Sequence, residues 1–269
     1  MGKFDGYLLV SDLDGTLIGR DHSVSDENVT AIREFVAEGG RFLGATGRTE
    51  LNVRPYTVGI PLSSPWILYN GAAIYDWARA SFIYKAPLPR SLAEAFVVRV
   101  MAQFRQVNVQ VYAGGPFCQV NPDGQPDAIA VREQQAFEDK PVEAITDDWL
   151  KVLFCSDVPE HLDGIEALFE SDPLRSVAHS MRSGPSYYEV TAQGVNKGTA
   201  LAHLKMLLDP APSRVVAIGD YNNDIEMLKE SDIPAAPESA LDEVKQHATI
   251  ITACHSRSAI ADLIRILAL

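Results

Sequence analysis

The chain of 269 residues carries 23 Lys and Arg against 36 Asp and Glu, which gives a formal net charge of −13. Nucleic-acid binding depends on clustered basic side chains, so this acidic balance disfavours that class of function. No apolar run has the length that a spanning helix needs, and the first residues meet Asp12 too soon for a secretory signal. We therefore expect a cytoplasmic protein that binds neither a membrane nor nucleic acid.

A short apolar run, Tyr7 to Val10, is followed by two carboxylates one residue apart, Asp12 and Asp14, and then by Gly15. Runs of this kind are typical of buried strands in a parallel sheet. Ligands bind at the carboxyl edge of such sheets, so two acids placed there favour a functional site. The alternative is that they only turn the chain before the glycine, since Asp and Gly are common turn formers.

The next elements repeat the alternation of helix and strand. Ser25 is a suitable N-cap for a helix that Gly39-Gly40 ends, and Arg41 to Ala45 predict a second strand. Thr46-Gly47-Arg48 follow, and then a helical stretch that Pro55 disturbs. A hydroxyl and free backbone N–H groups at a helix N-terminus favour phosphate binding, although Thr46 as a simple N-cap is the alternative.

The middle of the chain has a different pattern. Trp66 to Tyr69 predict a third strand, and two short alternating runs after it predict a hairpin; Pro87-Leu88-Pro89 then mark a boundary. Beyond it, hairpin strands alternate with helices, which suggests an independent α+β layer that covers or selects a ligand. The predicted helices of this layer are Ser91 to Arg105, Asp127 to Phe137 and Glu160 to Ser171, and its strands are Val107 to Ala113, Pro116 to Asn121, Leu150 to Ser156, Ser176 to Met181 and Tyr187 to Thr191.

The first pattern then resumes. Lys197 opens a helix, Arg214 to Ile218 predict a buried strand, and Asp220 and Asp224 follow that strand as Asp12 follows the first one. Short strands at Ile233 to Ala236 and Ala248 to Ile251 and a closing helix at Ser258 to Leu267 complete the chain. Strands from both chain ends imply one split core domain, residues 1–87 and 190–269, with an inserted domain, residues 88–189.

Carboxylates gathered at one sheet edge repel one another unless a cation joins them. Mg²⁺ prefers oxygen ligands and often shares a substrate phosphate, so we expect it to bind beside Asp12, Asp220 and Asp224. Thr46 and Lys197 would hold phosphate oxygens. A solvated lysine is the default for any single Lys, but the helix dipole disfavours a cation at a helix start, which favours a function for Lys197.

With a phosphate fixed there, a carboxylate is a competent nucleophile, and Asp12 lies nearest the strand end. Asp14, two residues further on, can protonate the leaving oxygen and then activate water. Asn223 would orient Asp12 or a metal-bound water. The sequence thus predicts a reaction through an aspartyl-phosphate in which Asp12 attacks phosphorus and Asp14 donates and accepts the protons.

Four motifs in order, D-x-D-G-T, T-G-R, N-K-G and G-D-x-x-N-D, resemble those of the haloacid dehalogenase superfamily. The insertion between the second and third motifs is similar to that of the Cof-like phosphatases. The resemblance implies an α/β fold with a Rossmann-like parallel-sheet core and an inserted α+β cap domain, dependence on Mg²⁺, and hydrolysis of a small phosphorylated metabolite, often a sugar phosphate.

Carried over by motif, the family's nucleophile matches Asp12 and its acid/base matches Asp14. Its phosphate ligands match Thr46 and Lys197. Its metal ligands match Asp12, Asp220, Asp224 and the backbone carbonyl of Asp14. Further motif positions match at Thr16, Gly47, Arg48, Asn70, Gly71 and Asn223, of which we place Gly47, Arg48 and Asn223 at the phosphate.

One departure is Pro237-Glu238-Ser239-Ala240, where similar proteins carry Met-Gly-Asn-Ala, so the ligand contacts of that loop are open. Two other functions also remain open at this point, a phosphomutase with the same aspartyl-phosphate and a regulatory protein that binds a phosphometabolite without turnover. The sequence gives neither the substrate nor the oligomeric state. Cap residues that could contact a substrate, or belong to the cap's own core or surface, are Tyr112, Arg132, Met181, Arg182 and Tyr187.

Overall fold

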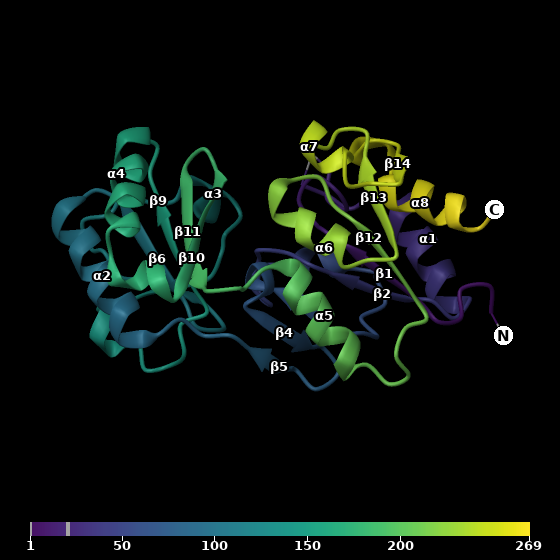
Figure 1. The fold of residues 1–269 in the computed structure, drawn as a ribbon, viewed down its shortest axis with the longest axis horizontal. Coiled ribbons are helices and arrows are strands. Elements are labelled where there is room, and N and C mark those ends of the chain that lie inside the picture. The colour runs from purple at the N-terminus through teal and green to yellow at the C-terminus, as the bar shows by residue number, and fades with distance from the viewer. Residues whose placement is uncertain (1, 20–21) are drawn as a thin grey trace. The chain divides into compact units, whose positions relative to one another are not determined.

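The structure is a computed structural model that describes residues 2–19 and 22–269 (Figure 1). These residues form two compact units. Unit 1 contains Met1–Arg48, Val53–Tyr84 and Asn196–Leu269, and unit 2 contains Thr49–Asn52 and Lys85–Val195. The division lies near the expected borders at 87/88 and 189/190, and the short stretch Thr49–Asn52 groups with unit 2 although the expected core range included it.

Unit 1 is built on a five-stranded parallel sheet with the order β14-β13-β12-β1-β2. Its strands are β1 (Tyr7–Ser11), β2 (Arg41–Gly44), β12 (Arg214–Ile218), β13 (Ile233–Pro237) and β14 (Ile250–Thr252). In β1, Val10 pairs with Leu43 of β2 and with Ala217 of β12, and all three are fully buried. The prediction that strands from both chain ends share one α/β sheet is therefore confirmed.

Five α-helices belong to the described part of this unit: α1 (Asp26–Ala37), α5 (Lys197–Leu207), α6 (Ile225–Lys229), α7 (Asp242–Lys245) and α8 (Ala259–Leu267). Helix α1 begins where predicted, because the side chain of Ser25 accepts a hydrogen bond from the backbone N–H of Asn28, at 3.2 Å. Helix α1 packs against α8, and α5 packs against α6. Helices α1 and α8 come from opposite ends of the chain, whereas α5 and α6 are separated by β12.

The helix predicted after Thr46 is wrong. Turns follow β2, and only a four-residue 3₁₀ helix forms, at Arg54–Thr57. The reason is that the backbone of Thr46 is bonded elsewhere, its N–H to the carbonyl of Ile67 (3.0 Å) and its carbonyl to the N–H of Asn70 (2.9 Å). Those partners lie at the end of β3 (Trp66–Leu68), which forms a separate three-stranded sheet with β4 (Ala73–Asp76) and β5 (Ser81–Lys85).

Unit 2 contains a six-stranded sheet with the order β10-β11-β9-β6-β7-β8, in which only β7 and β8 pair in parallel. The predicted helix up to Phe137 is wrong at its end: α3 stops at Arg132, and Phe137 pairs with Phe117 in the sheet. The strands are β6 (Asn108–Tyr112), β7 (Phe117–Gln119), β8 (Phe137–Asp139), β9 (Lys151–Cys155), β10 (Ala178–Gly184) and β11 (Tyr187–Ala192), and the helices are α2 (Arg90–Gln103), α3 (Ala128–Arg132) and α4 (Pro159–Glu170).

The core of unit 2 lies where α2 and α4 pack against one face of this sheet. Phe96 of α2 contacts Phe154 of β9 and Phe169 of α4 edge to face, with ring centroids 5.8 and 5.7 Å apart. Strand residues that alternate with this apolar set are polar, for example Gln110 and Glu189. The inserted layer is thus an α+β unit with its own core. Among residues 2–19 and 22–269, no helix has the length and apolar character needed to cross a bilayer.

Candidate active site

Asp12 lies directly beyond β1, which is paired on both sides in the sheet of unit 1, where the sequence places it. Its backbone N–H continues the sheet by bonding to the carbonyl of Ile218 (2.9 Å), and its side chain is only 8% exposed. The chain then turns at Gly15, which has a φ of 85°. A side chain there would also lie 2.4 Å from a carboxylate oxygen of Asp220, so both the turn and the close approach require glycine.

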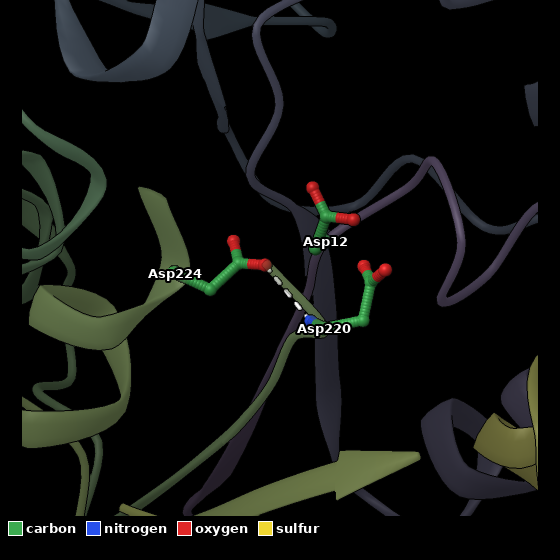
Figure 2. A group of neighbouring side chains, drawn as sticks. All are labelled: Asp12, Asp220 and Asp224. Atoms are coloured by element: carbon green, nitrogen blue, oxygen red, sulfur yellow. Dashed lines mark hydrogen bonds between the residues drawn. The ribbon is translucent and has the colours of Figure 1, made fainter. Parts of the chain in front are cut away.

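The end of the neighbouring strand β12 supplies two further acids, as Figure 2 shows. Oδ2 of Asp224 accepts the backbone N–H groups of Asp220 (2.9 Å) and Tyr221 (3.1 Å), which fixes the loop that carries Asp220. One oxygen from each of Asp12, Asp220 and Asp224 lies within 4.8 Å of the others. The sheet therefore gathers three carboxylates beyond the ends of two adjacent strands.

Lys197 is the cation of this group. Nζ donates to Oδ1 of Asp12 (2.5 Å) and to Oδ1 of Asp224 (2.6 Å), and the side chain is 1% exposed. The alternative of a solvated lysine at a helix end is therefore wrong. Helix α5 begins at this residue, capped by the side chain of Asn196, which accepts the N–H of Thr199 at 2.8 Å.

Gly71 allows the start of α5 to approach closely. Its φ is 101°, and a side chain there would lie 2.2 Å from the carbonyl oxygen of Asn196. The residues before it, Tyr69 and Asn70, also have positive φ values, 54° and 55°. Backbone strain of this kind persists only where the surrounding structure imposes it. Here it brings the segment after β3 against the helix that carries Lys197.

The electrostatics of the group are unbalanced. Burial raises the pKa of Asp12 well above its ordinary value, and Asp224 raises it further, while Lys197 acts in the opposite direction. Burial, with Asp224 again, raises the pKa of Asp220 to about 6. Burial alone would lower the pKa of Lys197, but Asp12 and Asp224 raise it above its ordinary value. Three acids with one lysine leave a surplus of negative charge.

A divalent cation fits this surplus. Mg²⁺ takes carboxylate oxygens and retains waters or a phosphate, and the oxygens of Asp12 and Asp220 are close enough to share one ion. Thr16 holds Asp220 for that purpose, since its hydroxyl donates to Oδ1 of Asp220 at 3.0 Å. Asp224 accepts bonds through both of its oxygens, from Lys197 and from the loop backbone, so it also builds the site around the other acids.

The loop after β2 brings Thr46 to the same edge of the sheet. Thr46 is 1% exposed, and its Oγ1 accepts the backbone N–H of Arg48 at 3.2 Å. Asn223, which we expected to orient Asp12 or a water, donates to Oδ1 of Asn70 at 3.2 Å. This bond ties the loop after β12 to the segment after β3. The backbone of Thr46 is itself fixed by its hydrogen bonds with Ile67 and Asn70, so its hydroxyl is positioned without the helix that the sequence predicted.

Asp14 differs from the other acids because its side chain is 52% exposed. Both of its oxygens accept hydrogen bonds from the guanidinium of Arg48, Oδ2 from Nε at 2.8 Å and Oδ1 from a terminal nitrogen at 2.7 Å. The sequence predicts Arg48 at the phosphate, whereas in the structure its guanidinium pairs with the carboxylate of the predicted acid/base.

Comparison with known proteins identifies the family. The family model described as haloacid dehalogenase-like hydrolase matches residues 9–264, nearly the whole chain. The chain belongs to the haloacid dehalogenase-like hydrolases. Within that family it is a phosphatase of the Cof-like type, as the resemblance of its four motifs indicated.

Two curated phosphatases match this haloacid dehalogenase-like hydrolase over most of its length. A 5-amino-6-(5-phospho-D-ribitylamino)uracil phosphatase of Bacillus subtilis is 31% identical over 264 residues, which are 97% of this chain and 95% of that protein. An HMP-PP phosphatase of Yersinia pseudotuberculosis is 29% identical over 245 residues, 89% of this chain and 86% of that protein. The crystal structure of a haloacid dehalogenase-like hydrolase from Bacteroides thetaiotaomicron shares the fold, with a TM-score of 0.87 at 24% identity, and covers 98% of this chain and 99% of its own.

The structure brings together most of the residues that the sequence singled out in this haloacid dehalogenase-like hydrolase. Asp12, Asp224 and Lys197 are buried together with the half-buried Asp220 beside them, and Thr46 lies in a loop bonded to the neighbouring segments. Contacts that the sequence analysis missed include the Asp14–Arg48 ion pair and the ring of Tyr56 below Arg48. Neither has a signal in the sequence, because both pairings depend on how distant loops meet.

The cap residues named from the sequence divide into two groups. Tyr112 donates to Oε1 of Gln110 (2.6 Å) and Tyr187 to Oδ1 of Asp127 (2.8 Å), within a buried polar network of unit 2. Arg182 instead bonds to two acids of α4, Asp163 and Glu166. Arg182 is therefore bonded to α4 of its own unit, Arg132 is exposed at the end of α3, and Met181 lies half-buried in β10.

Proposed function

We propose that the chain is a Mg²⁺-dependent phosphatase that hydrolyses a small phosphorylated metabolite through an aspartyl-phosphate on Asp12. The observation that carries the proposal is the buried group at the strand ends. In it the oxygens of Asp12 lie beside Nζ of Lys197 and within 4.8 Å of carboxylate oxygens of Asp220 and Asp224. A nucleophile, a cation and a metal-binding acid set in one place suit phosphoryl transfer, where most of the catalysis is electrostatic.

The steps follow from the roles of the chain's own residues. An oxygen of Asp12 attacks phosphorus, the bond from phosphorus to the ester oxygen breaks, and Asp14 gives its proton to that leaving oxygen. Asp14 then takes a proton from water, whose oxygen attacks the aspartyl-phosphate, and the bond to Asp12 breaks to release phosphate. Lys197 and Thr46 hold the phosphoryl oxygens during both steps. Mg²⁺, held by Asp12 and Asp220 with the backbone carbonyl of Asp14, would neutralise phosphate charge.

For the substrate we propose a phosphate ester of a polyhydroxylated carbon chain, that is, a sugar or sugar-alcohol phosphate. The support is the 31% identical relative, whose name places its phosphate on a ribityl chain. We also propose a cytoplasmic location, which the free thiols of Cys118, Cys155 and Cys254 support because such compartments keep thiols reduced. The charge of −13 continues to disfavour a nucleic-acid partner.

The test is phosphate release from a panel of sugar phosphates, sugar-alcohol phosphates and nucleotides, with and without Mg²⁺. We expect release that requires Mg²⁺ and that falls by about 10³-fold or more in Asp12→Asn, because the nucleophile is lost. Asp242→Asn, an exposed acid of α7 in the same unit, is the matched control and should keep full activity. Transfer of the phosphoryl group to another hydroxyl without release would indicate a phosphomutase, and no turnover of any ester would refute both enzymes.

A further inference from the structure

Arg48 and Asp14 form an ion pair through two hydrogen bonds. The guanidinium donates from two nitrogens to the two oxygens of the same carboxylate, at 2.8 and 2.7 Å. Paired parallel bonds of this kind fix the direction of a carboxylate as well as its position. The side chain of Arg48 is 13% exposed, whereas that of Asp14 is 52% exposed, so a largely buried arginine binds a half-exposed carboxylate.

Arg48 is itself held in place. Its guanidinium lies over the ring of Tyr56, with Cζ 4.7 Å from the ring centroid. Its backbone N–H donates to Oγ1 of Thr46, and its carbonyl accepts the N–H of Tyr69, both at 3.2 Å. One residue thus connects the hydroxyl that we place at the phosphate with the acid that we place at the leaving group.

Asp14 needs such a support. It follows β1 at the start of a turn, where the N–H of Gly15 bonds to the carbonyl of Ile18 at 3.2 Å. A half-exposed carboxylate in a turn samples several rotamers, and catalytic groups lose efficiency when they are not held in the reactive geometry. The two bonds from Arg48 restrict that freedom.

We propose that Arg48 is a positioning residue that holds Asp14 in place for proton transfer and is not a ligand of the phosphoryl group. For the first step Asp14 carries a proton taken from solvent. The protonated oxygen gives up its bond from Arg48, faces the ester and donates the proton to the leaving oxygen, while the bond to the other oxygen keeps the carboxyl group in place. With both bonds from Arg48 formed, as in the structure, the carboxylate is then held to accept the proton of the attacking water. The inference rests on the proposed phosphatase function, because it assigns a role within that reaction.

Two esters separate the proposal from phosphate binding. An alkyl phosphate needs a proton on its leaving oxygen, whereas p-nitrophenyl phosphate releases a stabilised phenolate that does not. For Arg48→Met we expect kcat on the alkyl ester to fall by about 10²-fold, the lower end of what general acid–base catalysis contributes. For the nitrophenyl ester we expect the burst of nitrophenolate release, which reports attack by Asp12 before water enters, to slow by less than about threefold. Inhibition by inorganic phosphate should stay within about twofold of the wild type.

Three further variants control the measurement. Arg79→Met breaks an Arg–Asp ion pair elsewhere in unit 1 and should leave both esters unaffected. Arg48→Lys keeps the charge but lacks the two-pronged donor, so it should restore only part of the activity on the alkyl ester. In an Asp14→Asn background, Arg48→Met should cause no further loss of kcat, since both changes remove the same proton transfer.

Other outcomes would overturn the proposal. An equal loss on both esters, with raised KM and weaker inhibition by phosphate, would show that Arg48 binds the phosphoryl group. Unchanged or faster turnover of the alkyl ester would show that Arg48 has no positioning role. If the wild type releases phosphate from neither ester nor from the panel, the phosphatase function itself fails and this role fails with it. The last result is distinguished from the others because it needs no variant.

Discussion

Each unit of the molecule buries a lysine, Lys151 in unit 2 and Lys197 in unit 1, and the two lysines differ in the acids around them. Lys151 pairs with one carboxylate, that of Glu189, at 3.2 Å, and both side chains are under 10% exposed. Lys197 contacts two carboxylates, and a third lies close by. The first arrangement cancels its charge, whereas the second leaves a net negative charge inside the protein.

The difference indicates what each group is for. A buried ion pair that is neutral overall needs nothing more than its own hydrogen bonds, and it serves the structure of its unit. A buried group with surplus charge is costly until a further ion binds, so it marks a binding site. Counting charges within hydrogen-bond reach therefore separates the two buried lysines, which their burial alone does not.

The largest expected effect comes from replacing each lysine by methionine. Lys197→Met should lower kcat by about 10³-fold or more, because the phosphoryl oxygens and Asp12 lose their cation. Lys151→Met should keep kcat but lower the free energy of unfolding by about 3 kcal/mol, because Glu189 loses its buried partner. Steady-state kinetics and denaturant titration measure the two quantities. Equal losses of kcat in the two variants would contradict the distinction between the units.

A second effect follows from the pKa of Asp220, which rises from an ordinary value of 3.8 to about 6 in the folded protein. Ionising this carboxyl destabilises the metal-free fold, so the penalty is absent below about pH 4 and complete above about pH 6. Asp220→Asn should therefore stabilise the metal-free protein by about 1–2 kcal/mol at pH 7.5 and have little effect at pH 4.

Binding of Mg²⁺ should remove the penalty for ionising Asp220, which provides a second test of this carboxylate. Thermal unfolding with added Mg²⁺ should show stabilisation of the wild type that grows as pH rises through about 6, since the ion needs the ionised carboxylate. Asp220→Asn should lose this gain. Stabilisation by Mg²⁺ that is equal at pH 5 and pH 7.5 would contradict the assignment of Asp220 as a ligand.

A third and smaller effect concerns the hydroxyl that holds Asp220. Thr16→Val removes the donor to Oδ1 while keeping the shape of the side chain, and it should weaken Mg²⁺ binding by about 10-fold. Isothermal titration with Mg²⁺ measures the change. Thr30→Val, on the exposed side of α1, is the matched control and should bind as the wild type does.

The smallest effect is expected on the surface of unit 2. Arg182→Met removes ion pairs with Asp163 and Glu166, which are half-exposed or more, so the free energy of unfolding should change by less than about 1 kcal/mol. KM for the preferred ester should stay within about twofold of the wild-type value. A large rise in KM would return Arg182 to the group of residues that contact the substrate.

The sequence predicted the parts of the fold that depend on local pattern. The runs at Tyr7 and Arg214 are continuous and apolar, so the buried strands and the acids beyond them could be placed. The helix after Thr46 could not be excluded, because the bonds that prevent it come from Ile67 and Asn70, about twenty residues later. The strand at Phe137 was missed because it is short and exposed, and only its pairing with Phe117 defines it.

The site divides in the same way. The order and spacing of the motifs predicted that the acids and Lys197 belong to one site, because residues that directly follow parallel strands lie at the same edge of the sheet. The contacts of Arg48 with Asp14 and of Thr16 with Asp220 join segments 34 and 204 residues apart, and no local pattern records such pairings. These contacts decide which groups are held still, and only the folded chain shows them.

The separation of Asp12 from its lysine by 185 residues has a consequence for the making of the protein. A ribosome that adds about 5–20 residues per second needs roughly 10–40 s to pass from one to the other. During that time β1 has no β12 beside it, while the residues of unit 2 emerge complete and can fold. A nascent chain therefore carries its nucleophile on an unpaired strand edge until the last quarter of synthesis. Chaperone binding in the cell should concentrate in that interval, and no fragment that stops before β12 should release phosphate.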